Sequence, residues 1–322
     1  MSANTAPAYA PSAAAPTTAA PGPDPAISVN ELTWRHGGRL ILDHIGLDVT
    51  AGAITGLLGR NGAGKTTLMR IVAGQQFATG GRVRVLGTDV GAAGDNSVLR
   101  RIVFVREDQT YPELSVGRVL RAASWFHPAW DAQFADSLLD EFELPRDRQV
   151  KKLSRGMRSA LGVVIGLAAR AEVTIFDEPQ TGLDAVARRV FYDRLLADYA
   201  EHPRTVLLST HQIDEVAGLL EHVIVLDHGR VVLNGPADDL RGGATRVSGP
   251  VLAVREFTEG RPVWDRRTLG SQESVVVVGP LDEPDRAPAR TSRLTLEPLS
   301  LQELVVHAAG RPATDPVKEA RA

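Results

Sequence analysis

The stretch GRNGAGKTT, residues 59–67, constrains the fold more than any other part of the 322-residue chain. It follows the apolar run AITGLLG, which predicts a buried strand, and it leads into TTLMRIVAG, which predicts a helix. Glycines in such a loop let backbone N–H groups curl around phosphate oxygens, and the helix directs the positive end of its dipole toward them. The match to G-x-x-x-x-G-K-[ST] therefore predicts a phosphate-binding loop that joins a strand to a helix.

Two side chains of this loop have specific expected tasks. Lys65 would neutralise charge on the β- and γ-phosphates of a nucleotide, and Thr66 would ligate Mg²⁺. The other loop residues that we expect to bind the nucleotide are Gly59, Asn61, Gly62, Ala63, Gly64 and Thr67. The alternative is a glycine-rich turn without a ligand, but the strand–loop–helix context favours the nucleotide.

The segment VTIFDEP supplies two adjacent carboxylates. Its apolar residues predict a buried strand, so Asp177 and Glu178 fall at the carboxyl end, where open α/β sheets bind their ligands. Asp177 is suited to hold Mg²⁺ through water, and Glu178 is suited to polarise an attacking water. The alternative is an acidic pair that caps a helix before the turn at Pro179. Together with the glycine loop, the pair favours nucleoside triphosphate hydrolysis.

The stretch LSRGM, residues 153–157, begins another predicted helix, RSALGVVIGLAA. Ser154, Gly156 and the local backbone N–H groups would face an anion at the positive end of this helix. The stretch falls in a helical insertion and therefore on a different lobe from the glycine loop. We expect the anion to be the γ-phosphate of a nucleotide held by the glycine loop of a second chain.

Four motifs, GRNGAGKTT, LSRGM, VTIFDEPQTGLD and LLSTH, occur in an order that resembles the ATP-binding subunits of ATP-binding cassette (ABC) transporters. The resemblance implies an ATPase that uses ATP and Mg²⁺ and that sandwiches two ATP molecules with a second copy of itself or a related ATPase. It also implies that Ser154 and Gly156 close on the opposite ATP and that Asp184 lies at the dimer interface. His211 would contact the γ-phosphate and act with Glu178 as a catalytic residue.

The chain departs from the family pattern at three of these positions. Arg155 and Met157 replace a glycine and a glutamine of the usual signature, which keeps its serine and its later glycine. After the strand RIVFV the family has a glutamine that senses Mg²⁺ and the transmembrane partner, and here Glu107 aligns with it, while Gln109 follows two residues on. A glutamate can still ligate Mg²⁺ or its water, although a solvated acidic loop is the alternative. The sequence does not separate Glu107 from Gln109 for this role.

Each of four side chains with rings, three tryptophans and one histidine, can be interpreted either as a contact for a ligand or partner or as part of the ordinary packing. The aromatic residue that stacks on adenine in relatives falls at His36, and Trp34 lies two residues earlier on the same side of a predicted strand. Either ring could stack on the base, and either could serve ordinary packing. Trp125 and Trp130 are expected in the small core of the helical insertion rather than on a contact surface.

The arrangement of strands and helices predicts an α/β fold. Short apolar runs alternate with helix-length segments, which indicates a mostly parallel central sheet covered on both faces. With the resemblance, this predicts a P-loop NTPase of ABC type with an antiparallel β edge subdomain, a helical insertion and a small C-terminal α+β appendage. The expected parts are a disordered Ala/Pro-rich tail at 1–26, an ATPase domain at 27–240 with its helical subdomain at about 107–160, the appendage at 241–310 and a flexible tail at 311–322.

The C-terminal appendage has its own local signals. RVSGPVLAV and ESVVVVGPL are typical of strands, and LSLQELVVHAAG is typical of a closing helix. Ser300 and Glu303 fit a capping box at the start of this helix, and Gly310 fits its end. The stretch also resembles the closing segment of ATPases that serve bacterial drug, antibiotic or lipid exporters.

Composition limits the possible partners. A formal net charge of −3 gives no basic field for nucleic acid, so we expect no nucleic-acid partner. The absence of cysteine excludes disulfides and thiolate chemistry. The longest apolar run, ALGVVIGLAA, is about half the roughly 20 residues that a membrane helix needs, and the N-terminus lacks the features of a signal peptide.

The function expected from these observations is that of a transporter motor. Two chains would close on ATP and drive transport, with export favoured over import, through separate transmembrane permease subunits. The chain itself would have no direct membrane span and would lie in the cytoplasm, peripheral on the inner face of the cell membrane. The alternative is a soluble ABC-type ATPase in a non-transport assembly complex. The sequence leaves open the cargo and the choice between a homodimer and a heterodimer.

Overall fold

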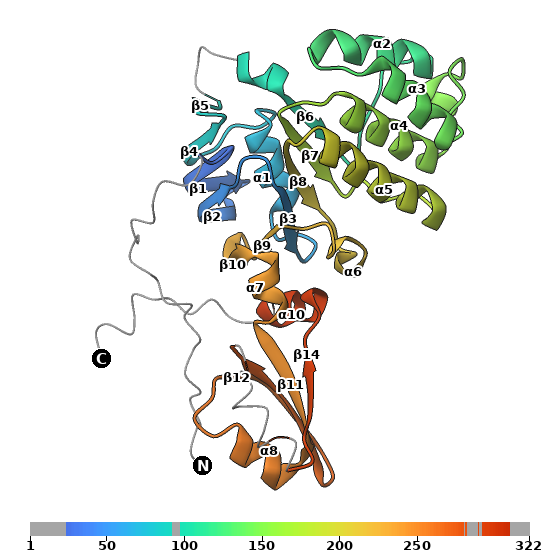
Figure 1. Ribbon diagram of the computed structural model, residues 1–322. Helices are drawn as coiled ribbons and strands as arrows, with labels where there is room; N and C mark the ends of the chain where they lie inside the picture. The colour runs from blue at the N-terminus through green and yellow to red at the C-terminus, as the bar shows by residue number, and fades with distance from the viewer. Residues whose placement is uncertain (1–23, 92–96, 280, 282–288, 290–291, 310–322) are drawn as a thin grey trace. The chain divides into compact units, whose positions relative to one another are not determined.

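A computed structural model describes residues 24–91, 97–279, 281, 289 and 292–309 of the chain (Figure 1). The chain forms two compact units, which divide between Asn234 and Gly235. Residues 1–23 of the predicted N-terminal tail and the last residues of the chain lie outside the described residues. Ala26, which was also placed in that tail, is buried, and its backbone N–H donates to the carbonyl oxygen of Val49 at 2.9 Å.

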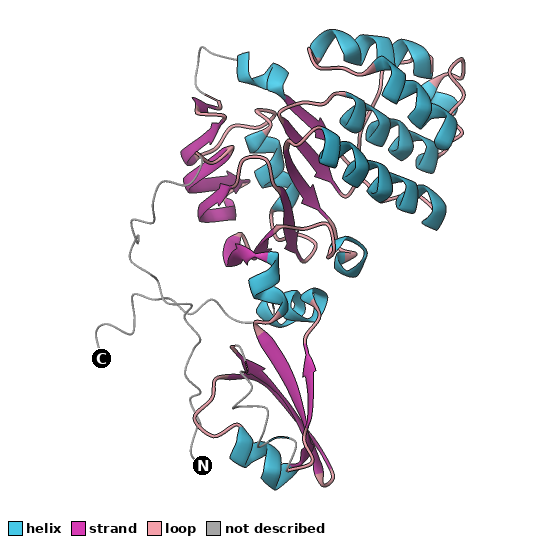
Figure 2. Cartoon of the chain, viewed as in Figure 1, coloured by secondary structure: helices cyan, strands magenta, loops and turns pink. Residues whose placement is uncertain are grey.

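The first unit is built around a six-stranded sheet, seen edge-on among the helices in Figure 2. In spatial order its strands are β10 (Arg230–Pro236), β9 (His222–Asp227), β3 (Ile54–Gly59), β8 (Thr205–Ser209), β7 (Val173–Asp177) and β6 (Ile102–Val105). The pairs β9–β3, β3–β8, β8–β7 and β7–β6 are parallel. Strands β7 and β8 are buried along their whole length, because their apolar, β-branched sequences are covered on both faces. The predicted mostly parallel central sheet is confirmed.

A second, antiparallel sheet packs beside the first through α1 (Lys65–Val72). Its strands, in spatial order, are β2 (Arg39–Val49), β1 (Ile27–His36), β4 (Gly80–Val85) and β5 (Thr88–Asp89). Apolar side chains of both sheets and of α1 form one core, which includes Leu32, Leu57, Met69, Val85 and Ile175. This core fixes the start of α1, and with it the glycine loop, against the carboxyl ends of β3 and β7.

Helices gather on the other side of the central sheet, drawn in green and olive in Figure 1. They are α2 (Val116–Phe126), α3 (Ala132–Glu141), α4 (Arg155–Ala168) and α5 (Ala185–Glu201). The short helices η1 (Ser97–Arg101), η2 (Val150–Lys152) and α6 (Ile213–Val216) lie in connections, and Val98 of η1 belongs to the core around α1. Trp130 is partly buried, but it packs against Val103 of β6 and against Ala169 and Ala171, not within the core of the helical insertion as predicted, because the chain beside it is bonded to the end of α4 through the Asp131 N–H and the Ala168 carbonyl oxygen. The prediction for Trp125 was wrong: its side chain is 69% exposed, because the buried side of α2 is formed by other residues such as Val119 and Leu120.

The second unit contains a four-stranded antiparallel sheet. In spatial order its strands are β12 (Val263–Leu269), β13 (Gln272–Val278), β11 (Ala244–Pro250) and β14 (Thr295–Pro298), and its helices are α7 (Ala237–Arg241), α8 (Val251–Phe257) and α10 (Leu301–Ala308). The stretch VLAV was predicted as strand but begins α8, because Pro250 ends the strand at a position suited to precede a helix. The capping box of Ser300 and Glu303 is confirmed, and Gly310 lies outside the described residues.

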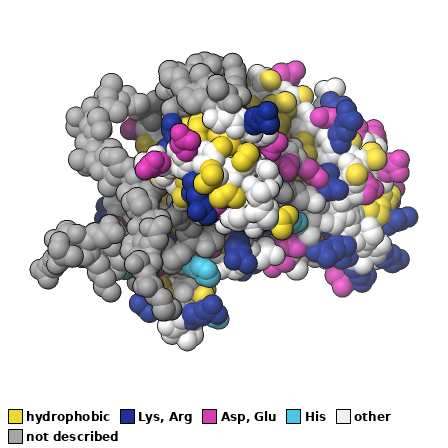
Figure 3. Space-filling model, turned by 90° about the horizontal axis from the view of Figure 1, so that it is seen from below, with side chains coloured by type: hydrophobic (Ala, Val, Ile, Leu, Met, Phe, Trp, Pro, Cys, Tyr) yellow, Lys and Arg dark blue, Asp and Glu magenta, His cyan; other side chains and the backbone are white. Residues whose placement is uncertain are grey.

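The surface carries both signs of charge. On the face drawn in Figure 3, Lys and Arg side chains alternate with Asp and Glu side chains, and apolar side chains lie between them. No helix within the described part of the chain has the length and apolar character needed to cross a membrane.

Candidate functional site

The glycine loop joins β3 to α1 in a backbone conformation that requires glycine at two places. Gly59 has φ +139°, and a Cβ there would lie 2.1 Å from the carbonyl oxygen of Leu226. Gly64, which precedes α1, has φ +106°, and a Cβ there would lie 2.7 Å from Leu42. At both positions a larger residue would clash with a neighbouring segment and would also have to adopt a backbone conformation that favours glycine. The loop is held by the neighbouring strands before any ligand is bound.

Lys65 is the buried cation of the loop. Its side chain is 7% exposed, and Nζ donates to the carbonyl oxygens of Gly59 at 2.8 Å and Arg60 at 3.3 Å. Burial lowers the pKa of the Lys65 ammonium below its ordinary value, and the nearby carboxylates of Glu178 and Asp177 oppose that shift. The ammonium is thus placed at the inner side of the loop with carboxylates behind it.

The two carboxylates of VTIFDEP lie at the carboxyl end of β7, as predicted, next to the end of β8. Asp177 pairs in register with Ser209, whose hydroxyl donates to Asp177 Oδ1 at 2.7 Å. The same hydroxyl oxygen accepts the backbone N–H of Glu178 at 3.0 Å. Ser209 therefore fixes the relative positions of the two acidic residues, and all three residues are buried.

The carboxylate of Glu178 is held by several groups at once. Its Oε2 accepts from Nε2 of Gln180 at 2.7 Å and from the backbone N–H of His211 at 3.3 Å, and it lies 2.7 Å from Nδ1 of His211. Its Oε1 lies 3.9 Å from Nζ of Lys65. Glu178 has φ +50°, a left-handed conformation that costs energy in a residue other than glycine and that is held here by the surrounding contacts.

These groups line one pocket of about 570 Å³. Of the residues predicted from the sequence, the pocket is lined by Asn61, Gly62, Ala63, Gly64, Lys65, Thr66, Thr67, Glu107, Asp177, Glu178 and His211. Residues far apart in the sequence are thus brought together around the glycine loop. The pocket combines the carboxylates of Asp177 and Glu178, the buried ammonium of Lys65 and the glycine loop that leads into α1, an arrangement suited to a polyphosphate with a divalent cation.

Three residues at this pocket were missed by sequence reasoning. Arg39 and Ile41, from β2, and Thr181, from the turn after β7, also line it. No local signal marks these residues: Arg39 and Ile41 reach the pocket only through the packing of β2 against the glycine loop, and Thr181 reaches it through the turn that follows Glu178. His36 does not line the pocket: it lies at the exposed end of β1 and stacks on Trp34, with ring centroids 5.5 Å apart.

The predicted signature and interface residues do not line this pocket. Ser154 precedes α4, and its hydroxyl accepts the backbone N–H of Met157 at 3.1 Å. Asp184 precedes α5, and its carboxylate accepts the backbone N–H of Ala187 at 2.8 Å. Both side chains are exposed and act as helix caps. Gly156 is required by close packing, because a Cβ there would lie 2.6 Å from the carbonyl oxygen of Gly182.

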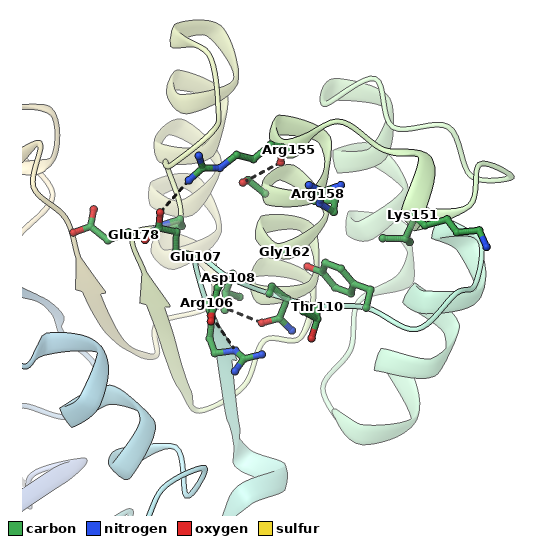
Figure 4. A pocket seen from close by; sticks show the side chains of 15 residues that line it. Arg106, Glu107, Asp108, Thr110, Lys151, Arg155, Arg158, Gly162 and Glu178 are labelled. Carbon is green, nitrogen blue, oxygen red and sulfur yellow. Dashed lines mark hydrogen bonds and ion pairs between the residues drawn. The ribbon is translucent and has the colours of Figure 1, made fainter. Parts of the chain in front are cut away.

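A second cavity, of about 650 Å³, lies between the loop after β6 and the start of α4 (Figure 4). Glu107 lines both this cavity and the glycine-loop pocket. At the second cavity its Oε1 accepts from Nη2 of Arg155 at 3.1 Å, the contact drawn as a dashed line in Figure 4. Gln109 lines only the second cavity, where its Oε1 accepts the backbone N–H of Arg106. Two of the three departures from the family pattern, Glu107 and Arg155, are therefore partners.

A strand–glycine loop–helix with a buried lysine, next to a strand that ends in two carboxylates, defines a P-loop nucleoside triphosphatase (NTPase). The family described as ABC transporter matches residues 42–181. The chain is 32% identical to the daunorubicin/doxorubicin resistance ATP-binding protein DrrA of Streptomyces peucetius, over 91% of this chain and 95% of that protein. It therefore belongs to the ABC transporter family, as predicted, and it is an ATP-hydrolysing subunit that powers transport.

Two further comparisons agree with this assignment. The chain is 33% identical to the Nod factor export ATP-binding protein I of Cupriavidus metallidurans, over 64% of this chain and 69% of that protein. It resembles the solved structure of an ATP-binding subunit of an ABC transporter with a TM-score of 0.61 at 26% identity, over 67% of this chain and 91% of that one.

Proposed function

We propose that two ATPase chains, either two copies of this one or this one with a related ATPase, close on two ATP molecules and drive export through separate transmembrane permease subunits. Two of the relatives above are named for drug resistance and for Nod factor export, which favours export over import. Cargo contacts would lie in the permease. The ATPase would work in the cytoplasm, peripheral on the inner face of the cell membrane.

The residues around the glycine loop fit a nucleotide with Mg²⁺. Among the residues that line the pocket, the hydroxyl of Thr66 and the carboxylates of Asp177 and Glu107 are oxygen groups of the kind that Mg²⁺ accepts, and Glu178 is a third carboxylate there. No group of three or more His, Asp or Glu side chains gathers as a metal site in the described parts of the chain. Mg²⁺ would therefore be held by Thr66 and Asp177 together with phosphate oxygens, and it would neutralise charge on the phosphates. Glu107 would contact its water.

Glu178 is the proposed general base for hydrolysis. Its carboxylate would take a proton from the attacking water as the water oxygen bonds to the γ-phosphorus. The bond from that phosphorus to the bridging oxygen would break, and ADP and phosphate would form. Lys65 would stabilise charge on the phosphates, and His211 would hold Glu178 and contact the γ-phosphate. The observation that carries this proposal is the position of Glu178, fixed by His211 and 3.9 Å from Lys65 at the glycine loop.

The signature residues would complete the site of the second chain. Ser154 and Gly156 lie at the exposed start of α4 and away from the pocket of their own chain, which is consistent with their facing a neighbouring γ-phosphate. Asp184 would lie at the interface between the two chains. His36, or Trp34 beside it, would stack on the adenine, with the exposed end of β1 as the platform.

The substitution Glu178→Gln tests the assignment of the base. It keeps the shape of the side chain and removes the acceptor for the water proton, so turnover falls by about 10²–10⁴-fold while ATP binding is kept. The measurement is single-turnover hydrolysis together with ATP affinity. Asp140→Asn is a matched control, because Asp140 is an exposed carboxylate on α3. Turnover close to that of the unmodified protein in Glu178→Gln would overturn the assignment.

The transporter role is tested with the same variant as bait. Tagged Glu178→Gln protein with Mg-ATP, which should stay in the closed dimer, is recovered from detergent-solubilised membranes and its partners are identified by mass spectrometry. A polytopic membrane protein in stoichiometric amount supports the proposed motor. Soluble partners alone would favour a non-transport assembly complex.

A further inference from the structure

Gln180 is a buried polar residue to which neither the sequence motifs nor the proposed hydrolysis assigns a role. It lies two residues after Glu178 in the turn between β7 and α5, and it is only 2% exposed. A buried amide is costly unless its groups are hydrogen-bonded. Its Nε2 lies 2.7 Å from Glu178 Oε2 and 2.8 Å from Thr210 Oγ1, so both N–H groups have acceptors.

The chemistry of these neighbours fixes which end of the amide faces them. An ionised carboxylate only accepts hydrogen bonds, so the NH₂ group and not the carbonyl oxygen of Gln180 must face Glu178. Thr210 is itself held, because its Oγ1 accepts the backbone N–H of Gln212 at 2.9 Å. Gln180 therefore ties the turn after β7 to the turn after β8, and Glu178 and His211 stand on these two turns.

The contact also separates the two oxygens of Glu178. Oε2 lies within hydrogen-bond distance of Gln180 Nε2, His211 Nδ1 and the His211 backbone N–H. Among the described side chains, the charged partner recorded at Oε1 is Lys65, with 3.9 Å between Nζ and Oε1. Oε2 is thus occupied by protein donors, while Oε1 lies on the side of the glycine loop.

The carbonyl oxygen of Gln180 supports a role beyond folding. This buried oxygen has no hydrogen-bond partner among the described residues. An apolar side chain of similar length would avoid that unpaired acceptor, and the amide contributes through its donors alone. Its two N–H groups donate to Glu178 and to Thr210, the residue before His211.

We propose that Gln180 is a positioning residue for hydrolysis: it holds Oε2 of Glu178 so that Oε1 receives the proton of the attacking water. The inference rests on the proposed role of Glu178 as general base. Losing the contact lets the carboxylate rotate away from the water, and a misplacement of about 1 Å can cost about 10²-fold in rate. Gln180 does not touch the nucleotide in this scheme, so ATP affinity is unaffected.

The test is Gln180→Met, which keeps the length and removes both donors. We expect kcat to fall about 10- to 100-fold, with ATP affinity and melting temperature close to those of the unmodified protein. Gln133→Met is the matched control with normal turnover, because Gln133 is exposed on α3 and lies outside both the glycine-loop pocket and the contacts of Gln180. A kcat within about twofold of the control would overturn the proposal.

A double-mutant cycle separates positioning from a structural role. If Gln180 acts through Glu178, adding Gln180→Met to Glu178→Gln lowers single-turnover hydrolysis no further. An equal loss in both backgrounds would overturn the proposal, whereas normal turnover in Glu178→Gln alone would overturn the base assignment instead. If Gln180→Met does not fold, Thr210→Val gives the second test. It should lower kcat with ATP affinity kept, and an unchanged kcat would count against the proposal.

Discussion

The residues of the proposed ATP site form two halves in this chain: a buried half around the glycine loop, with Lys65 and Glu178, and an exposed half at the starts of α4 and α5, with Ser154 and Asp184. The two halves are held in very different ways. Lys65 and Glu178 have side chains 7% and 11% exposed, and both are fixed by contacts from several strands and turns. Ser154 and Asp184 are exposed, and each has a hydrogen bond to the backbone of the helix that it precedes. The first half is formed by folding alone. The second half is an exposed surface at two helix starts, where the proposed function places the nucleotide of a second chain.

The largest expected loss of ATPase activity comes from a substitution in the buried half. Lys65→Met removes the only ammonium at the pocket among the described residues and leaves the two carboxylates without their cation. We expect kcat/KM for ATP to fall by about 10²–10³-fold, because the lysine would stabilise charge on the transferred phosphate. Steady-state ATPase assays with Mg-ATP measure it.

The control for this prediction is Lys152→Met, which removes an exposed lysine from η2. It should leave both kcat/KM and ATP affinity unchanged. If Lys65→Met were as active as Lys152→Met, the buried half would not be the phosphate site, and the comparison between the two halves would lose its basis.

The substitution Ser154→Asp tests the exposed half. Aspartate caps a helix about as well as serine, so α4 is kept, but its negative charge faces the proposed phosphate of the second chain. Because like charges repel, we expect turnover to fall roughly 10- to 100-fold, with ATP binding to the separate chain unchanged. Ser115→Asp, which makes the same change at the start of α2, is the matched control.

Mixing variants then tests whether the halves belong to different chains. In a mixed dimer of Ser154→Asp and Glu178→Gln, one site carries both changes and the other carries neither. Activity should therefore reappear when the two inactive proteins are combined. No recovery, with mixed dimers present, would place Ser154 and Glu178 in the same site and remove the need for a second chain.

The features that could be predicted from the sequence are those with a local pattern. The glycine loop and strands β3, β7, β8 and β9 are continuous in the chain, and their apolar runs and turn residues are sufficient to locate them. The capping box of Ser300 and Glu303 has the same local character. The carboxyl ends of these parallel strands lie at one edge of the sheet, so their pairing brings Lys65, Asp177 and Glu178 to the same place.

The features that were missed depend on packing between distant segments. Arg39 reaches the pocket because β2 lies against the glycine loop, and Gln180 contacts Glu178 because β7 and β8 end side by side. Exposure of Trp125 follows from the direction in which α2 packs. Val251 enters a helix because Pro250 ends β11. Periodicity within one segment does not contain this information.

Ser300, like Ser154, caps a helix, but no ligand is proposed for it, so replacing it should have a smaller effect that is limited to stability. Ser300→Ala removes the cap of α10 in the C-terminal unit and should cost about 0.5–2 kcal/mol in the free energy of unfolding of that unit, with ATP turnover unchanged. The backbone N–H of Ser300, and after it Arg246, lowers the pKa of Glu303. This contribution to stability is present above the ordinary pKa of a glutamate and is lost as pH falls through the lowered value. Ser300→Ala keeps both of these donors, so the stability of the variant and of the unmodified protein should fall together in acid, with the difference between them largely kept. Denaturant titrations at neutral and acidic pH measure it, and lost turnover would contradict it.

The smallest expected effect concerns the ion pair that joins the two halves, Glu107 with Arg155. Both side chains are largely exposed, at 46% and 67%, so the pair should contribute about 0.2–1 kcal/mol to the free energy of unfolding, in a cycle of Glu107→Gln, Arg155→Met and the double variant. Lys151 with Glu113 is a matched exposed pair, 2.7 Å apart, whose stability coupling should be similar.

The two pairs should differ in turnover, because Glu107 also lines the glycine-loop pocket and Arg155 follows Ser154 at the start of α4. Coupling in kcat is therefore expected for Glu107 with Arg155 and not for Lys151 with Glu113. If neither pair shows coupling in kcat, the contact is an ordinary surface ion pair. The separation between the buried and the exposed half would then be sharper, because no side-chain bridge between them would affect turnover.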